Sequence, residues 1–475
     1  MRILSVTHDH PFARGSGVAT YCQDLELELV GRGHSVAHLT SWERSWRPAP
    51  YLRWFEERGI TFASLVNSPL PPAMSPERPL ADCADGRIER LMRNCLERTR
   101  PDLVHIHAFQ GLSGSVLPMI KRHGIPVIVT LHDFWALCTR IVLMRADGMP
   151  CSGPDGGKNC ARYCANPGSL GRRVYRRLMA VVPPGPGREL VQRARAQMVR
   201  PAAGDHSAWS ATSDTAAAGE AQGSLRDTLA HGARSARLLE MLREADAVLA
   251  VSNFVRDTFV RHGVPEARIR VLRLGLDLSQ TDLWRIRQAR APLRVGFLGR
   301  VVHLKGAHIL AEAVRGIPPD QARVLCFGPA GAEDAARLQT LAGRPLEFRG
   351  PYDRGDLPAI LDEVDVVVVP SLFPESVGLA TLEAQAAGLP VIASRIGAVP
   401  EYIQDGQNGL LFEPGSSRAL QACLRQFLDT PQLVAAMSAR TTPPPTMVRH
   451  VDLLTEVYRA CLGHGHRTPH ATQSA

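Results

Sequence analysis

Four charged side chains in the C-terminal half of the sequence have the types and spacing to bind a ligand that carries both hydroxyl groups and phosphates. Glu375 and Glu383 lie either side of a glycine-containing turn after the apolar run "VDVVVVP", and paired carboxylates accept hydrogen bonds from neighbouring hydroxyls. Arg300 and Lys305 follow the run "LRVGFLG", where a planar guanidinium and an ammonium suit a diphosphate. Each pair alone is also compatible with a solvated surface. Together they indicate a site for a nucleotide-linked sugar.

Two turns in the N-terminal half also carry residues that could face a ligand. After "RILSVTH", Gly15 and Gly17 let the backbone approach a ligand closely before a helix begins. At the end of "IPVIVTLH", His132 could hydrogen-bond a ligand, and Asp133 could contact a hydroxyl or orient a neighbour. Taken alone, a tight turn and a polar turn are the simpler interpretations of these two segments.

The elements that must position these residues follow from an alternation of short β-branched runs with helical segments. A first set of runs comprises "RILSVTH", "HSVAHLT", "DLVHIH", "IPVIVTLH" and "AVLAVS", and a second set comprises "LRVGFLG", "ARVLCFG", "LEFRG", "VDVVVVP" and "PVIAS". Ligands of open parallel sheets bind at the carboxyl ends of the strands, where the candidate residues lie. We predict an α/β protein with two doubly wound domains, residues 1–285 and 292–440, a closing helix at 446–462 and a disordered tail at 463–475.

Length and composition agree with two globular domains. The chain has 475 residues, of which 45% are hydrophobic and 21% are charged, which is typical of a soluble globular protein. The first residues lack the pattern of a signal peptide, and no stretch reaches about 18 uninterrupted apolar residues. From this pattern we expect a cytoplasmic protein.

The net charge of +9 is concentrated in one window, where residues 171–200 hold eight arginines and one acidic residue. Read with helical periodicity, residues 170–182 place Arg172, Arg173, Arg176 and Arg177 opposite an apolar side. Such a helix could lie on an anionic membrane, such as the inner face of the plasma membrane, or pack on its own domain with a solvated arginine face. A nucleic-acid partner is disfavoured because aromatic residues and a known binding motif are missing. The small, polar residues of 183–236 predict a flexible insertion.

Four of the ten cysteines lie within one turn-rich segment, residues 138–164. Cys138, Cys151, Cys160 and Cys164 could form a closed, structural tetrahedral zinc site that fixes a loop beside His132. The spacing is not a double CxxC. Reduced free thiols, and another cluster or a redox pair, therefore remain alternatives.

With these residues in place, the sequence resembles the retaining glycosyltransferases of the GT-B class, in the family that includes bacterial mannosyl- and glucosyltransferases (family 4 type, glycosyl transferases group 1). The resemblance covers nearly the whole chain except the insertion and the tail. It is carried by "RGSGVATYCQDLELELVGRGHSVAHLT", "VIVTLHDFW", "VGFLGRVVHLKG" and above all "PSLFPESVGLATLEAQAAGLPVIASRIGAVPEYIQDGQNGLLF". It implies two Rossmann-like domains that face a central cleft.

The resemblance implies a role for each candidate residue. Glu375 would contact hydroxyls of the transferred sugar, Glu383 the ribose, and Arg300 with Lys305 the diphosphate. The turn from Gly15 to Gly17 would face the diphosphate, and His132 the sugar near the reacting carbon. Gly378 and Leu379 belong to the same expected donor-binding set.

The implied reaction moves a hexose, with retention of configuration, from a UDP- or GDP-sugar to a saccharide or lipid-linked acceptor in polysaccharide or glycolipid synthesis. No cofactor is required for catalysis, because positive charges would stabilise the leaving nucleoside diphosphate. Val377 stands where the family commonly has an aromatic residue, and Gly397 with Ala398 where it commonly has a glycine pair, which leaves the donor open. A nucleotide-sugar epimerase or a phosphorylase of the same fold, and a non-catalytic scaffold, are the alternatives.

Overall fold

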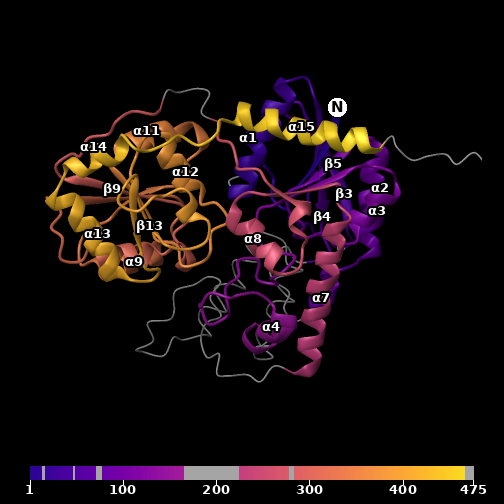
Figure 1. Ribbon diagram of the computed structural model, residues 1–475, viewed down its shortest axis with the longest axis horizontal. Helices are drawn as coiled ribbons and strands as arrows, with labels where there is room; N and C mark the ends of the chain where they lie inside the picture. The colour runs from indigo at the N-terminus through magenta and orange to yellow at the C-terminus, as the bar shows by residue number, and fades with distance from the viewer. Residues whose placement is uncertain (13–15, 47–48, 71–77, 165–223, 278–282, 466–475) are drawn as a thin grey trace, which may run out of the picture.

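The computed structural model describes residues 1–12, 16–46, 49–70, 78–164, 224–277 and 283–465. These residues form two α/β lobes that lie side by side (Figure 1). The first lobe is built from the N-terminal part of the chain, and the second from residues 283–440. The last helix returns to the first lobe. The prediction of two doubly wound domains is therefore confirmed.

The N-terminal lobe contains an eight-stranded sheet in the order β3-β4-β2-β1-β5-β6-β7-β8. Its strands are β1 Arg2–Val6, β2 Ser35–Thr40, β3 Tyr51–Glu57, β4 Ile60–Val66, β5 Leu103–Ile106, β6 Val127–Leu131, β7 Ala247–Ala250 and β8 Ile269–Val271. Its helices are α1 Gly17–Gly31, α2 Gly86–Thr99, α3 Val116–Arg122, α4 Lys158–Tyr163, α7 Leu225–Arg243 and α8 Asn253–Arg261. All pairings are parallel except β3 with β4. This β3–β4 hairpin is an addition to the predicted set of strands.

The C-terminal lobe contains a six-stranded parallel sheet in the order β11-β10-β9-β12-β13-β14. Its strands are β9 Leu293–Leu298, β10 Ala322–Phe327, β11 Glu347–Gly350, β12 Val366–Val369, β13 Val391–Ser394 and β14 Gly409–Phe412. Its helices are α9 Ala307–Ala313, α10 Ala332–Ala342, α11 Leu357–Glu363, α12 Leu379–Ala386, α13 Ser417–Asp429 and α14 Gln432–Ser438. The strand order reverses between β9 and β12, and such a switch point is where open sheets bind ligands.

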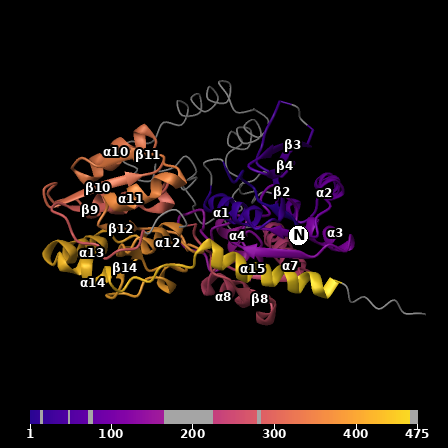
Figure 2. The ribbon, with the colours of Figure 1, turned by 90° about the horizontal axis from the view of Figure 1, so that it is seen from above.

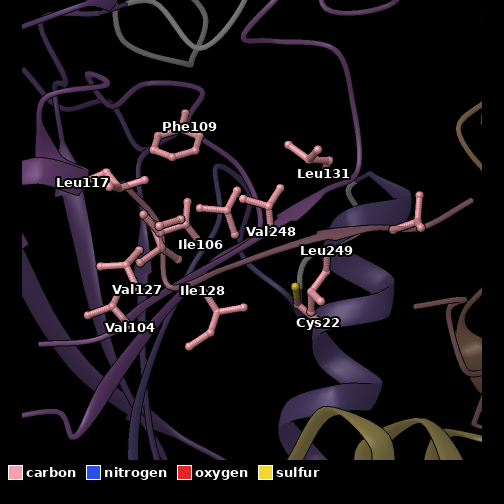
Figure 3. Close-up of a cluster of buried hydrophobic side chains, with 14 of the residues drawn as sticks. Cys22, Val104, Ile106, Phe109, Leu117, Val127, Ile128, Leu131, Val248 and Leu249 are labelled. Atoms are coloured by element: carbon pink, nitrogen blue, oxygen red, sulfur yellow. The ribbon is translucent and has the colours of Figure 1, made fainter. Parts of the chain in front are cut away.

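Apolar strands covered on both faces make up the core of each lobe. In β12 all four residues are valines and all four are buried, as expected for a central parallel strand. Figure 3 shows the corresponding cluster of the first lobe, where Ile106, Ile128 and Val248 from neighbouring strands pack together. The first core continues across the lobe boundary, because Val377 and Leu382 of the second lobe belong to it. The two lobes thus share an apolar contact.

The C-terminal helix α15, Met447–Gly465, lies along the N-terminal lobe (Figures 1 and 2). The Tyr458 hydroxyl is hydrogen-bonded to His105 Nδ1 at 2.7 Å, and Arg32 of α1 pairs with Asp452 at 2.7 Å. The closing helix predicted at 446–462 corresponds to α15. The described chain therefore belongs to the first lobe up to residue 277, to the second lobe from 283 to 440, and to the first lobe again in α15.

The structure differs from the expected flexible insertion, 183–236, at its C-terminal end. Helix α7 begins at Leu225, where Ser224 caps it by accepting a hydrogen bond from the Asp227 N–H. The first turns of α7 have few large apolar residues, as the composition indicates. Hydrogen bonds of polar side chains hold this part of the helix in place instead. The buried Arg234 donates to Asp82 Oδ2 at 2.7 Å and to the Trp135 carbonyl at 2.8 Å.

Several predictions concern residues outside the described ranges. They are the basic helix 170–182, the insertion as far as residue 223, Gly15 and the tail from residue 466. Within the described ranges, no helix combines the length and the apolar character needed to cross a membrane.

Candidate active site

The candidate residues of the second lobe come from the two loops that flank its switch point. The loop after β9 carries Arg300 and Lys305, and the loop after β12 carries Glu375. The loops pack tightly where Gly306, with φ of +72°, approaches the Pro370 carbonyl. A Cβ at position 306 would lie 1.8 Å from that oxygen. The glycine therefore allows Lys305 to reach the neighbouring loop.

Lys305 and Glu375 form an ion pair. Lys305 Nζ donates to Glu375 Oε1 at 2.7 Å, and Ser371 Oγ donates to the same oxygen at 2.7 Å. The ammonium group also lies 5.0 Å from the centre of the Phe373 ring. Glu375 is 6% exposed. A buried carboxylate needs such partners, because an unpaired charge away from water is costly.

Arg300 differs from Lys305, although both lie on one loop. Its side chain is exposed, and no other side chain of the described chain forms a hydrogen bond or an ion pair with it. Its guanidinium is free to bind an anion at the mouth of the second sheet.

Glu383 lies in the second turn of α12 and is held by Arg354, a residue that the sequence analysis did not single out. Arg354 Nη1 donates to Glu383 Oε1 at 2.8 Å, and Nη2 donates to Asp24 Oδ2 at 2.9 Å. Asp24 lies on α1, so this guanidinium bridges the two lobes. Burial raises the pKa of Glu383, and the charges of Arg354 and Lys305 oppose the rise. Burial also raises the pKa of Asp24, to about 6, against the charge of Arg354.

Both glutamates keep one oxygen free. Glu375 and Glu383 each use Oε1 for a cation, whereas Oε2 has no hydrogen-bond partner in the described chain and is not sealed from solvent. Lys305 lies near enough to both carboxylates to act on their charge. The structure therefore brings Lys305, Glu375 and Glu383 together, with two acceptor oxygens open to a ligand.

Helix α1 of the first lobe contacts this group of the second lobe through residues that lie on one helical face. A Cβ at Gly17 would lie 3.0 Å from Leu379 Cδ1, at the start of α12. Asp24 contacts Arg354, as above, and the Tyr21 ring lies 5.1 Å from the His132 ring. Gly17, Leu379 and His132 are thus placed along the junction of the lobes. Gly378 precedes α12 with φ of +79°, a left-handed backbone conformation that glycine adopts more readily than other residues.

His132 directly follows β6 and is buried beside other histidines. Its Nε2 lies 3.2 Å from His107 Nδ1. Burial lowers the pKa of His132 to about 3, so its imidazole is neutral. The Asp133 carboxylate is engaged by other protein groups, because it accepts from Gln110 Nε2, after β5, at 2.5 Å and from the Trp135 N–H of its own loop at 2.8 Å.

A second link between the lobes lies at the start of α8. The carboxylate of Glu401, from the C-terminal lobe, accepts from the N–H groups of Asn253 and Phe254 at 3.0 and 2.6 Å. Ser252 Oγ donates to the Ser376 carbonyl at 2.7 Å. An acid at a helix N-terminus is favourable because it meets unpaired N–H groups and the positive end of the helix dipole. This contact holds the loop of Glu375 against the first lobe.

The four clustered cysteines are neighbours, since Cys151 contributes to the raised pKa values of Cys138, Cys160 and Cys164, and Cys138 contributes to those of Cys160 and Cys164. Cys138, Cys160 and Cys164 are buried, and Cys151 is partly exposed. Burial raises the pKa of Cys164 to about 12. Within the described residues, no group of three histidine, cysteine or acidic side chains is arranged to hold a metal ion. The zinc site stays a prediction.

Sequence reasoning missed Asp24, Arg354 and Glu401, which join the lobes in the described chain; Arg273, 3.6 Å from Glu401, contributes to the same junction. For Arg354 a local signal existed, because "DRGD" places Asp353 and Asp356 in a capping box around a short turn. The box could have marked an ordered loop. Its partner Asp24, however, is 330 positions away, and no sequence spacing indicates such a contact.

Three family models match the chain. They are described as Glycosyl transferases group 1 over residues 292–430, Glycosyl transferase 4-like domain over 16–204, and Glycosyltransferase Family 4 over 183–280. The first covers the C-terminal lobe with Arg300, Lys305, Glu375 and Glu383. The second covers His132 and the start of α1. The matches thus fall on both halves of the candidate site.

Curated relatives include the D-inositol 3-phosphate glycosyltransferase of Corynebacterium jeikeium, 34% identical over 231 residues, which are 43% of this chain and 54% of the relative. The putative colanic acid biosynthesis glycosyltransferase WcaL of Escherichia coli is 28% identical over 210 residues, 41% of this chain and 51% of the relative. The chain thus spans about half the length of the curated relatives it matches.

Solved structures of similar fold cover nearly the whole chain. Sucrose-phosphate synthase from Thermosynechococcus elongatus aligns with a TM-score of 0.62 and 18% identity over 97% of this chain and 99% of that one. Anabaena Alr3699/HepE in complex with UDP and glucose aligns with a TM-score of 0.57 and 17% identity over 97% and 100%. At these identities the likeness shows the fold alone.

Proposed function

Since the chain belongs to the GT-B glycosyltransferases of the group 1, family 4 type, we propose that it transfers a hexose, with retention, from a nucleotide-diphosphate sugar to a saccharide or lipid-linked acceptor. The observation that carries this proposal is the group of Lys305, Glu375 and Glu383 at the switch point of the second sheet. It combines a cation with two carboxylates, each of which has a free oxygen.

In the proposed complex, Arg300 and Lys305 bind the diphosphate and stabilise the charge that develops on it as the glycosidic bond breaks. Glu375 Oε2 accepts from hydroxyls of the sugar, and Glu383 Oε2 accepts from the ribose. Gly17, Gly378 and Leu379 let the backbone of both lobes approach the donor. His132 contacts the sugar from the first lobe. Closure of the lobes excludes water from the reacting centre.

The donor is a UDP- or GDP-sugar. Anabaena HepE, which shares the fold, has been solved with UDP-glucose, so UDP-glucose is the first donor to test. The proposed setting is the cytoplasm, with the acceptor in cell-surface polysaccharide or glycolipid synthesis, which is supported by the likeness to a putative colanic acid biosynthesis glycosyltransferase. Catalysis in this scheme uses side-chain charges and needs no cofactor.

The experiment is a thermal-shift and calorimetric screen of the full chain with UDP-glucose and GDP-mannose. One donor should bind, and Lys305→Ala should weaken its binding about 10- to 100-fold, or roughly 1.4–2.7 kcal/mol, because a charge-assisted contact to the diphosphate is lost. Lys121→Ala is the matched control, since Lys121 also sits in an ion pair, with Asp246 at 2.6 Å, but on the first lobe. Equal binding by wild type and Lys305→Ala would contradict the proposal.

Contact with an anionic membrane through residues 170–182 is a separate part of the proposal. Replacing Arg172, Arg173, Arg176 and Arg177 by glutamate should abolish binding to liposomes that contain anionic lipid. Neutral liposomes serve as the control. Unchanged binding of the variant would remove the membrane from the scheme and leave the transfer reaction untouched.

A further inference from the structure

The first lobe contains a group of buried histidines that meets the candidate site at His132. His105 belongs to β5 and His107 follows it, whereas His450 comes from α15. The rings of His105 and His107 have their centres 3.8 Å apart, with the ring planes tilted by 39°. His107 is 2% exposed and His132 7% exposed. Which nitrogen of each ring carries the proton is therefore decided by a few contacts inside the protein.

His450 illustrates how such a contact fixes a tautomer. Its Nδ1 lies 2.8 Å from the Arg273 carbonyl oxygen, which can only accept, so Nδ1 carries a proton. Burial lowers the pKa of His450 to about 4, so the ring is neutral and Nε2 is an acceptor. The Tyr21 hydroxyl then donates to His450 Nε2 at 2.7 Å. This ring provides a reference within the same protein.

His107 and His132 share one contact, from His107 Nδ1 to His132 Nε2 at 3.2 Å. The other two nitrogens differ in their surroundings. His107 Nε2 is buried and has no hydrogen-bond partner. His132 Nδ1 has no partner in the described chain either, but it is not among the atoms sealed from solvent. The pair therefore has a closed end, the buried His107 Nε2, and an open end, the His132 Nδ1 that solvent can reach.

Two neutral arrangements can make this contact. If His132 Nε2–H donates, neutral His107 must carry its proton on Nε2, where a buried N–H has no acceptor. If His107 Nδ1–H donates, only a lone pair is left unused at the closed end. Orphaned buried N–H groups are rarer than unused acceptors, which favours the second arrangement. A charged pair is excluded because burial and the neighbouring histidines lower the pKa values of both rings.

We propose that His107 is a positioning residue that holds His132 in the tautomer with its proton on Nδ1. His132 then presents a neutral N–H donor at the open end of the pair, beside the carboxyl end of β6. The identity of the acceptor rests on the proposed function: the His132 Nδ1–H donates to an oxygen of the transferred sugar. Because Nδ1 has no lone pair in this tautomer, His132 cannot take a proton through it, and it acts as a hydrogen-bond donor rather than as a general base.

The test is a long-range ¹H–¹⁵N correlation spectrum of the full chain labelled at histidine and recorded near pH 7 without nucleotide sugar. His132→Gln assigns the His132 signals by their loss. His132 should show a protonated Nδ1 and an unprotonated Nε2, with the same pattern as His450. A protonated Nε2, or rapid averaging of the two nitrogens, would overturn the proposal.

Variants test whether His107 sets this state. His107→Phe keeps a ring against His105 but removes the donor, so the His132 nitrogens should shift towards an averaged pattern. His123→Phe replaces an exposed histidine directly after α3 and should leave the His132 signals in place. Unchanged His132 signals in folded His107→Phe would refute the role of His107. If that variant does not fold, His107→Asn, whose amide can donate at the same position, should preserve the wild-type pattern, and its loss would count against the role.

The inference about His107 and the proposed function can be refuted independently of each other. The tautomer is measured without a ligand, whereas the donor screen measures binding of UDP-glucose or GDP-mannose. A protonated Nδ1 in a protein that binds neither donor supports the inference about His107 and contradicts the proposed function. Donor binding together with a protonated Nε2 supports the function and contradicts the inference.

Discussion

At the scale of single residues, the two site glutamates share one arrangement and yet face different parts of the proposed donor. Glu375 is paired with Lys305 through Oε1, and Glu383 is paired with Arg354 through Oε1. Each pairing gives a buried carboxylate a cationic partner and leaves Oε2 for a ligand. Lys305 acts on both carboxylates, but the cation that donates the hydrogen bond differs between them, so the role of each acid can be measured independently with its own ligand.

This independence gives a prediction for two isosteric variants. Glu383→Gln should weaken binding of UDP itself, or of GDP if the donor is a GDP-sugar, because it removes the acceptor for the ribose. Glu375→Gln should weaken binding of the intact nucleotide sugar but not of the free nucleotide. Loss of a hydrogen bond to a charged group is worth roughly 1.5–3 kcal/mol. Calorimetry with the nucleotide and the nucleotide sugar measures both effects, and equal losses for both ligands in both variants would contradict the assignment.

At the scale of elements, the loop 138–164 and helix α7 are held together by close backbone contact rather than by a large apolar core. A Cβ at Gly157 would lie 2.0 Å from the Thr228 carbonyl oxygen and 2.6 Å from the Gly232 nitrogen, both on α7. The neighbouring Gly156 has nothing within 4 Å of its Cβ position. Both glycines have positive φ, 95° and 61°. They therefore differ mainly in the space around them.

This difference gives a matched pair of variants. Gly156→Ala should cost only the strain of a left-handed alanine, about 1–2 kcal/mol. Gly157→Ala should cost roughly 1–3 kcal/mol more, because the methyl group meets backbone that cannot move aside cheaply. Thermal unfolding of the two variants measures the difference. Equal melting temperatures would show that the loop and α7 are not tightly packed.

The predicted zinc site belongs to the same loop. Burial raises the pKa of the Cys138 thiol, and hydrogen bonds from the backbone N–H groups of Arg140 and Leu143 oppose the rise. The side chains would have to turn to enclose a metal. We expect about one zinc per chain by elemental analysis. Cys160→Ser should lose the metal, whereas Cys95→Ser, in α2, should keep it. Protein without zinc or iron, and with reactive thiols at these positions, would favour free cysteines.

The sequence predicted elements well where one periodic pattern was sufficient. The valines of 366–369 could only be a buried strand, and the runs that end in His132 and Leu298 were equally clear. The start of α7 was missed because its anchor, Arg234 with Asp82, joins residues that are 152 positions apart. The β3–β4 hairpin was not predicted, because β3 is a partly exposed edge strand without a continuous apolar run. Composition records neither long-range polar contacts nor strand direction.

At the scale of the whole molecule, the lobes are joined by apolar contacts, by two crossings of the chain and by charged bridges. Arg300, Lys305 and Glu375 could be proposed from the sequence because each lies in the loop after a predicted strand, whereas Glu383 lies on the helix that follows such a loop. The bridges could not, because Asp24 with Arg354 and Glu401 with the start of α8 depend on how the lobes dock. Docking brings Asp24 into a buried position next to the cation that holds Glu383. Site and interface are therefore electrostatically connected.

The raised pKa of Asp24 gives this connection a pH dependence. Its folded pKa of about 6 lies above the ordinary value of 3.8. Between these values the folded chain binds more protons than the unfolded chain, so the contribution of Asp24 to the free energy of unfolding falls as pH rises towards 6. Above pH 6 the contribution becomes constant, with Asp24 ionised and paired to Arg354.

Replacing Asp24 by asparagine removes this titration. From pH 5 to pH 7 the wild type should lose on the order of 1 kcal/mol of stability relative to Asp24→Asn, which urea unfolding at the two pH values measures. Asp102→Asn is the control. The carboxylate of Asp102 pairs with Arg2, and its pKa is lowered, so it is ionised throughout this range and its removal should leave the slope unchanged. Equal slopes for wild type and Asp24→Asn would mean that Asp24 is not buried against Arg354 in solution, and that the lobes do not meet at this bridge.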